Sequence, residues 1–206
     1  MKTVYLIRHG ETRDNREGIF RGRSEVPLSA AGLRQAGELR AYFSGLQVER
    51  VFSSPLKRAA ETAAICFPGR AIELQELVNN LDLGRWTGRG KKEIARDEPE
   101  AWRRWLEEPE KMSFPGGESL AAVKARARHF NRLLAAANEE RIAVVSHRSV
   151  LKALLAESLG LGEKWFWKFH LDNASVTVLL HDPLRGFVLA KLNRTEHLSE
   201  YVFEWD

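Results

Sequence analysis

The segment VYLIRHG, residues 4–10, decides the fold. Its four apolar residues precede an Arg-His-Gly turn, which is typical of a short buried strand that ends at the turn. The segment IAVVSHR, residues 142–148, has the same layout. Each places a histidine just beyond the carboxyl end of a predicted strand, and ligands of open α/β sheets bind at that edge. We therefore expect His9 and His147 to lie together.

A third segment, VFSSPLKR at residues 51–58, brings an arginine to the same edge. A strand is predicted at residues 51–52. A helix is predicted to start at Ser54 and Pro55, with the serine as N-cap and the proline at the first helical position. Arg58 then lies in the first turn of that helix. Two histidines and two arginines are therefore expected to converge on one point.

The rest of the chain alternates between helical and strand periodicity. Apolar spacing predicts helices at residues 30–43, 118–137 and 149–159, and strands at 142–145, 176–180 and 187–192. This alternation predicts an α/β sheet with helices on both of its faces.

The middle of the chain, residues 79–117, has a different composition. It is rich in glycine, tryptophan and charged residues. We interpret it as a lid-like segment of loops and short helices inserted over the core of a single domain that spans residues 1–206.

Composition narrows the functional classes. The chain has 206 residues, of which 44% are apolar, and no apolar run approaches the roughly 20 residues that cross a bilayer. We expect no signal peptide at the N-terminus and no membrane partner. The lone Cys66 cannot form an internal disulfide, which indicates a cytoplasmic location.

The net charge is +4, yet basic and acidic residues are interleaved along the chain. Without a basic block or an aromatic platform, nucleic acid is not an expected partner. Positive charge gathered in a pocket for a small anion explains the excess equally well. A homodimer through the final strand or the region of Trp165 remains open.

The convergent histidines and arginines suit a phosphoryl group. Arginine offers paired donors to phosphate, and a neutral imidazole can attack phosphorus. The sequence has neither a Walker-type loop nor a carboxylate cluster for magnesium. We therefore expect phosphoryl transfer without a metal or a cofactor.

The motifs of this chain resemble the histidine phosphatase (phosphoglycerate-mutase-like) superfamily. Within that superfamily, the chain is most similar to small metal-independent phosphatases of the phosphoserine and ribazole type. The resemblance covers nearly the whole chain in order, through LIRHGET at 6–12, PLS at 27–29, SSPLKR at 53–58, PGGESL at 115–120, VSH at 145–147 and DNAS at 172–175. It implies a three-layer α/β/α fold with a mostly parallel central sheet.

The resemblance also implies roles for individual residues. His9 becomes the nucleophile that carries the phosphate, and Arg8, Arg58 and His147 become the phosphate clamp. Asn15 becomes a further donor to the phosphate, although it could simply cap a turn.

One position departs from the family pattern. The family places a general-acid glutamate four residues before a Gly-x-x-x-Gly stretch, and Asn80 stands there in this chain. Asparagine cannot donate a proton at useful pH. Asp82 is a candidate substitute because strand alternation returns it to the same face. Glu76, Glu11 and Glu118 are others, and a leaving group that needs little protonation is another explanation.

The position before the first glycine, Leu83, is expected to be polar in phosphoserine-type members. Leucine disfavours phosphoserine and indicates a more apolar substrate. Trp86 and the cluster at residues 165–167 could line such a pocket, although core packing or a subunit interface explains them as well.

The expected function is therefore a metal-independent phosphomonoesterase of a small metabolite. One alternative is a phosphoglycerate mutase, although the middle segment offers no clear second phosphate clamp. Another is a phosphate-binding pseudoenzyme, which only Asn80 supports. A phosphatase of protein phosphohistidine is disfavoured because such chains lack the middle segment.

Overall fold

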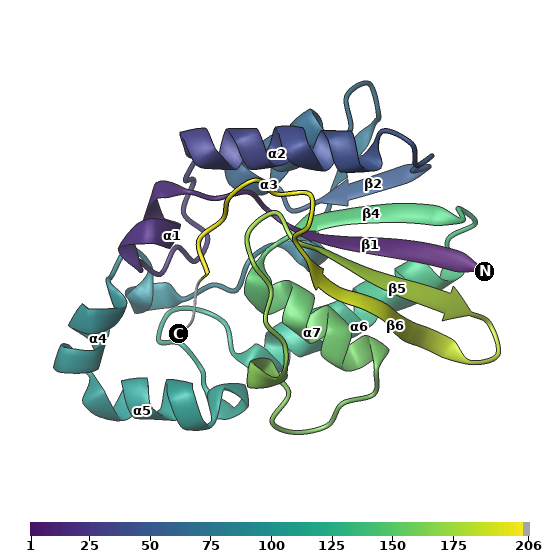
Figure 1. Cartoon of the computed structure of the whole chain (residues 1–206). Coiled ribbons are helices and arrows are strands. Elements are labelled where there is room, and N and C mark those ends of the chain that lie inside the picture. The colour runs from purple at the N-terminus through teal and green to yellow at the C-terminus, as the bar shows by residue number, and fades with distance from the viewer. Residues whose placement is uncertain (204–206) are drawn as a thin grey trace.

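The computed structural model describes residues 1–203 and is built on one six-stranded sheet in the order β3-β2-β4-β1-β5-β6 (Figure 1). Strands β3, β2, β4 and β1 are parallel, and β5 and β6 form an antiparallel pair beside β1. The expected α/β fold with a mostly parallel sheet is confirmed. The strands are β1 (Lys2–Arg8), β2 (Arg50–Ser53), β3 (Ile72–Leu74), β4 (Arg141–Ser146), β5 (Val176–Asp182) and β6 (Gly186–Arg194).

Helices cover both faces of the sheet. The helices are α1 (Arg13–Glu17), α2 (Ala30–Phe43), α3 (Lys57–Cys66), α4 (Lys91–Asp97), α5 (Pro99–Glu107), α6 (Leu120–Ala136) and α7 (Arg148–Ser158). Strand β1 shows how the layers form, because alternate side chains leave a strand on opposite faces. Val4 and Leu6 pack with α6 and α7, whereas Tyr5 and Ile7 pack with α2 and α3.

No helix within residues 1–203 combines the length and the apolar character that a membrane crossing requires.

The predicted helix start at Ser54 and Pro55 is wrong, because α3 begins at Lys57. Leu56 has an extended backbone with ψ of 135°, so the chain is not yet helical there. The Ser54 hydroxyl instead accepts the Leu56 N–H at 3.3 Å in a local turn. Elements α1 and β3 were not predicted, since one is short and polar and the other has only three residues.

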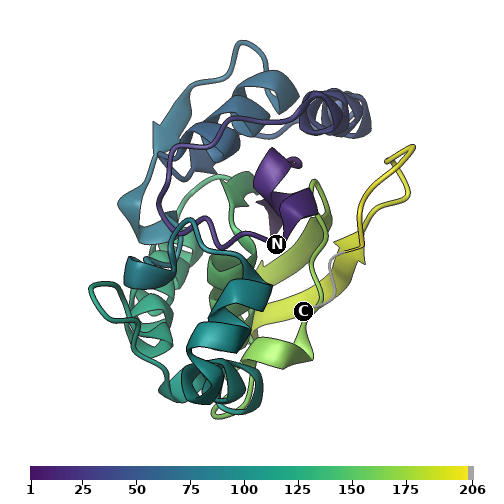
Figure 2. The same cartoon turned by 90° about the vertical axis from the view of Figure 1, so that its left-hand side faces the viewer.

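The middle segment lies over the carboxyl edge of the parallel strands. Figure 2 looks onto this edge and shows α1, in purple, with the teal helices α4 and α5 beside it. Trp86, Trp105 and Phe114 belong to the same apolar cluster as α6 and α7. Phe20, just after α1, packs on Trp86 and Trp105 with ring centroids 5.5 and 5.9 Å away. This apolar contact joins the segment after α1 to the middle segment.

Candidate active site

Three neighbouring strands deliver polar groups to one point. Strand β1 leads into His9, β2 into Ser54 and β4 into His147. The sheet ladder continues past these ends, because the N–H groups of His9 and Ser54 donate to carbonyls of β4 at 3.0 and 2.9 Å. The two imidazole rings are both buried, and their centroids are 5.1 Å apart. The predicted convergence of the two histidines is confirmed.

The His9 ring is held in one orientation. Its Nδ1 lies 2.7 Å from the Gly10 carbonyl, which can only accept, so Nδ1 carries the hydrogen and Nε2 keeps its lone pair. The Gly10 N–H donates to Thr62 Oγ1 at 3.0 Å. A Cβ at Gly10 would lie 2.7 Å from the Gly32 carbonyl oxygen, so this turn has no room for a side chain. The turn therefore fixes both the tautomer and the position of the ring.

Both imidazoles are held in the neutral form. Burial is the largest cause that lowers the pKa of His9 well below its usual value, and Arg58, Arg8 and Arg21 lower it further. Burial also leads the causes that lower the pKa of His147, followed by Arg58 and His9. At neutral pH the His9 Nε2 is consequently an uncharged, unprotonated nitrogen, the form that can act as a nucleophile.

His147 is anchored through one nitrogen. Its Nε2 and the Ser54 hydroxyl are 2.7 Å apart and share a hydrogen bond. Its Nδ1 is buried and has no hydrogen-bond partner among the described residues. The Ser54 hydroxyl is therefore the one group among the described residues that holds this ring by a hydrogen bond.

Arg58 carries positive charge into the interior. Its side chain is fully buried in the first turn of α3 and donates to the Ser24 and Gly22 carbonyls at 2.8 and 3.0 Å. Burial lowers the pKa of Arg58 to about 9, with a further contribution from Arg21. The guanidinium thus stays charged at neutral pH. Arg8 is equally buried and donates to the Leu171 carbonyl at 2.7 Å.

Asn15 both caps a turn and lines the pocket. Its Oδ1 accepts from the Thr12 N–H at 2.9 Å and from the Thr12 hydroxyl at 2.8 Å, so it does cap a turn. The same side chain lines the pocket beside His9. Because Oδ1 makes the cap, a role for the amide nitrogen toward a ligand is compatible with it.

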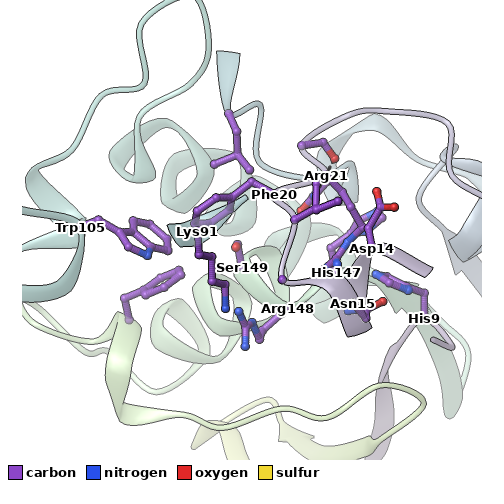
Figure 3. Close-up of a pocket in the computed structure, with 16 residues that line it drawn as sticks. His9, Asp14, Asn15, Phe20, Arg21, Lys91, Trp105, His147, Arg148 and Ser149 are labelled. Carbon is purple, nitrogen blue, oxygen red and sulfur yellow. Dashed lines mark hydrogen bonds between the residues drawn. The ribbon is translucent and has the colours of Figure 1, made fainter. Parts of the chain in front are cut away.

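The pocket itself has two ends. In Figure 3 the labelled residues His9, Asp14, Asn15, Arg21 and His147 gather at one end, which we call the inner end. The outer end carries Phe20, Lys91, Trp105, Arg148 and Ser149. Leu83, Asn80 and Phe166 also line the pocket. It is thus charged near the histidines and both aromatic and basic farther out.

Four charged lining residues were not singled out from the sequence: Asp14, Arg21, Lys91 and Arg148. Signals for three of them existed. Asp14 lies between His9 and Asn15 in the same motif, Arg21 lies between two glycines, and Arg148 directly follows His147. Lys91 had no comparable signal, because it lies in a charged stretch that reads as solvated surface.

The structure separates the two positions considered for the missing acid. Asn80 lines the pocket and donates its side-chain N–H to the Gly22 carbonyl at 2.7 Å. Asp82 accepts the Gly84 N–H at 2.9 Å and lines a different hollow, beside Arg23 and Arg85. The strand alternation assumed for Asp82 does not apply, because residues 79–83 form no strand.

Some of the predicted aromatic residues line the pocket, whereas others lie in the core. Trp86 is buried in the core and is not among the residues that line the pocket. Of the cluster at residues 165–167, Phe166 lines it. Trp105, on α5, and Phe20 are the other large aromatic side chains among the described residues that line the pocket. The pocket therefore has an apolar wall to which Trp86 does not contribute.

Metal ligands are not grouped in the described part of the chain. Within residues 1–203, no three side chains of histidine, cysteine, aspartate or glutamate lie close enough to hold a metal ion.

Comparison with known proteins places this site in context. The family model of the histidine phosphatase superfamily (branch 1) matches residues 4–195. Phosphoserine phosphatase 1 of Hydrogenobacter thermophilus is 36% identical, over 99% of this chain and 98% of its own. The adenosylcobalamin/alpha-ribazole phosphatase of Escherichia coli is 31% identical, over 82% of this chain and 85% of its own.

Solved structures show the same likeness. The phosphoserine phosphatase of Entamoeba histolytica, in complex with 3-phosphoglyceric acid, superposes with a TM-score of 0.85 at 28% identity. The alignment covers 96% of this chain and 100% of that one. Bacillus stearothermophilus YhfR superposes with a TM-score of 0.89 at 28% identity, over 97% and 100% of the two chains.

Proposed function

The chain belongs to the histidine phosphatase superfamily (branch 1) and is a phosphatase of that family, and from this premise we propose that it hydrolyses a small phosphorylated metabolite through a phosphohistidine on His9. The observation that carries the proposal is the state of the His9 ring. Its Nδ1 is tied to the Gly10 carbonyl at 2.7 Å, and its Nε2 is left as a neutral nucleophile among buried arginines.

The proposed reaction has two steps. Arg8, Arg58 and His147 bind the phosphoryl oxygens and neutralise the charge that develops on them. The His9 Nε2 attacks phosphorus, the bond from phosphorus to the ester oxygen breaks, and the leaving oxygen takes up a proton. Water then attacks phosphorus and releases a proton, which replaces the one taken up in the first step. The bond from phosphorus to nitrogen breaks, its electron pair returns to the His9 Nε2, and phosphate leaves.

The outer end of the pocket indicates the general chemical character of the leaving group. Trp105 and Phe166, whose ring centroids are 5.0 Å apart, provide an apolar wall there, and Leu83 adds apolar surface to the same pocket. A leaving group with an apolar body complements this wall. Related proteins are named for phosphoserine and for alpha-ribazole phosphate. Leu83 favours the more apolar kind of substrate.

The proposal requires no metal ion and no cofactor, because protein cations take the place of a metal at the phosphate. The cytoplasm remains the proposed compartment, on the ground of the lone Cys66.

The test uses a panel of phosphomonoesters with the full-length protein. Released phosphate and acid-labile phosphate on the protein are measured together. We expect phosphate to be released from one class of substrate. After rapid quenching without acid, we also expect phosphate to remain bound to the protein. His9→Ala should lower turnover roughly 10⁴-fold or more, whereas His129→Ala, at an exposed position on α6, should leave it unchanged.

Other outcomes would assign a different function. Interconversion of 2- and 3-phosphoglycerate without net hydrolysis would identify a mutase. Phosphate binding without any turnover would identify the binding protein that Asn80 suggested. Full activity of His9→Ala would overturn the assignment of the nucleophile.

A further inference from the structure

The carboxylates suggested by the sequence are all committed elsewhere. Glu11 binds the Ser29 hydroxyl at 2.7 Å and Arg16 at 2.9 Å. Glu118 pairs with Arg126 at 3.2 Å and with Arg23 at 3.1 Å. None of the four candidate carboxylates lines the pocket, Glu76 and Asp82 included.

Among the described residues that line the pocket, one alone has a carboxylate, and it is Asp14. It lies on α1 next to Asn15, five residues after His9 in the chain. Figure 3 shows it at the inner end, with His9, His147 and Arg21. Its side chain is half-buried, and no described residue ties it up in an ion pair or a side-chain hydrogen bond.

The electrostatics of Arg58 link Asp14 to the proposed phosphate site. Burial and the Arg21 charge lower the pKa of Arg58, whereas the carboxylates of Glu25 and, less strongly, Asp14 raise it. Arg58 is the buried cation expected to bind the phosphoryl group. Asp14 therefore interacts electrostatically with Arg58 and lines the same pocket as His9 and His147.

Asn80 explains why the carboxyl is needed at another position. Its amide N–H donates to the Gly22 carbonyl, which also accepts from Arg58. An ionised carboxylate at position 80 could not donate to that carbonyl. Asn80 therefore serves to hold the loop that positions Arg58, and it leaves the proton to be supplied by another group.

We propose that Asp14 is the general acid and base of this phosphatase, a catalytic role that rests on the proposed function. In the first step the protonated Asp14 carboxyl gives its proton to the ester oxygen as the bond to phosphorus breaks. In the second step the Asp14 carboxylate takes a proton from the water that attacks the phosphohistidine. The carboxyl is thereby restored for the next turnover.

The test compares two substrates that differ in their need for a proton. An alkyl phosphate such as glycerol 2-phosphate has a poor leaving group, whereas p-nitrophenyl phosphate has a good one. Asp14→Asn should lower the kcat of the alkyl substrate about 10²- to 10³-fold. With p-nitrophenyl phosphate it should give a burst of one nitrophenol per site, because the first step survives and the second slows.

Matched variants separate chemistry from structure. Glu17→Gln changes a surface carboxylate on the same helix, where Glu17 pairs with Arg13, and should leave both substrates unaffected. Asp14→Glu keeps the carboxyl and should retain more alkyl turnover than Asp14→Asn. Adding Asn80→Glu to Asp14→Asn should recover part of the alkyl rate, by placing an acid at the position used by relatives. Circular dichroism checks that each variant is folded.

The outcomes are distinct. Asp14→Asn with alkyl turnover within threefold of the wild type would overturn the proposal. Equal loss of the nitrophenol burst and of alkyl turnover would also overturn it, because a purely structural role acts on both. If the wild type releases no nitrophenol and no phosphate, the phosphatase function itself fails instead.

Discussion

The inner and outer ends of the pocket are built in different ways. The histidines of the inner end rest on strands β1, β2 and β4, whose register carries His9, Ser54 and His147 to one edge. The outer end is built from helix starts and loops, such as Lys91 at the start of α4 and Trp105 on α5. A sheet fixes its side chains through shared hydrogen bonds, whereas loops can change without disturbing the core.

This difference indicates that the two ends of the pocket bind different parts of the substrate. In the proposed function the inner end binds the phosphoryl group, which all phosphomonoesters share. The outer end is complementary to whatever is attached to it. A change at the inner end should therefore affect all substrates alike, and a change at the outer end should discriminate among them.

The largest expected effect is at Arg58. Arg58→Met removes a buried charge while keeping much of the side-chain volume. Loss of this donor should lower kcat/KM about 10²- to 10³-fold for every phosphomonoester tested. Arg96→Met, on the exposed surface of α4, serves as the control. A loss that varies widely between substrates would contradict the division between the two ends.

The next effect concerns stability and pH. Above pH 6.5 the two buried histidines are neutral in both the folded and the unfolded chain. Below it the unfolded chain binds protons that the folded chain cannot, because the pKa values of His9 and His147 are lowered by burial. As the pH falls below 6.5, the free energy of unfolding should decrease by roughly 1 kcal/mol per pH unit for each ring. For both rings together, the decrease should be about 2 to 3 kcal/mol per pH unit.

Urea unfolding in phosphate-free buffer between pH 7 and pH 5 measures this slope. His9→Ala should remove about half of the contribution of the pair, whereas Leu83→Ala, which removes no titratable group, should leave the slope unchanged. A slope that is insensitive to His9→Ala would show that the ring takes up protons in the folded state.

The smallest effect is expected at the outer end. Leu83→Ala shortens the apolar wall and should lower kcat/KM about tenfold for an aromatic phosphomonoester. Methyl phosphate, which does not reach the wall, should change less than threefold. Steady-state kinetics with both substrates provide the measurement, and a uniform loss would mean that Leu83 acts through the inner end.

Sequence alone predicted the fold and the meeting of the histidines because both follow from strand ends. Apolar runs that stop at Arg8 and Ser146 locate the carboxyl edge, and parallel neighbours bring such ends together. The helix at residues 30–43 was predicted with its observed bounds, because its N-cap Ser29 is a clear signal.

The outer end and the acid could not be predicted in the same way. Asp14 lies on a five-residue polar helix that has no apolar period to reveal it. The acids favoured by spacing in the chain, such as Asp82, are bound to local backbone. Which carboxylate faces the pocket depends on how the loop of residues 18–22 folds under the middle segment, and no local pattern encodes that contact.

That loop has a mechanical consequence. The Phe20 N–H donates to the Arg89 carbonyl at 2.9 Å, the Gly88 N–H to the Phe20 carbonyl at 2.7 Å and the Lys91 N–H to the Gly18 carbonyl at 3.0 Å. With these bonds intact, the middle segment cannot swing away by itself, since it would pull α1 with it. Widening the entrance would therefore also displace Asp14, which would couple product escape to the withdrawal of the proposed proton donor.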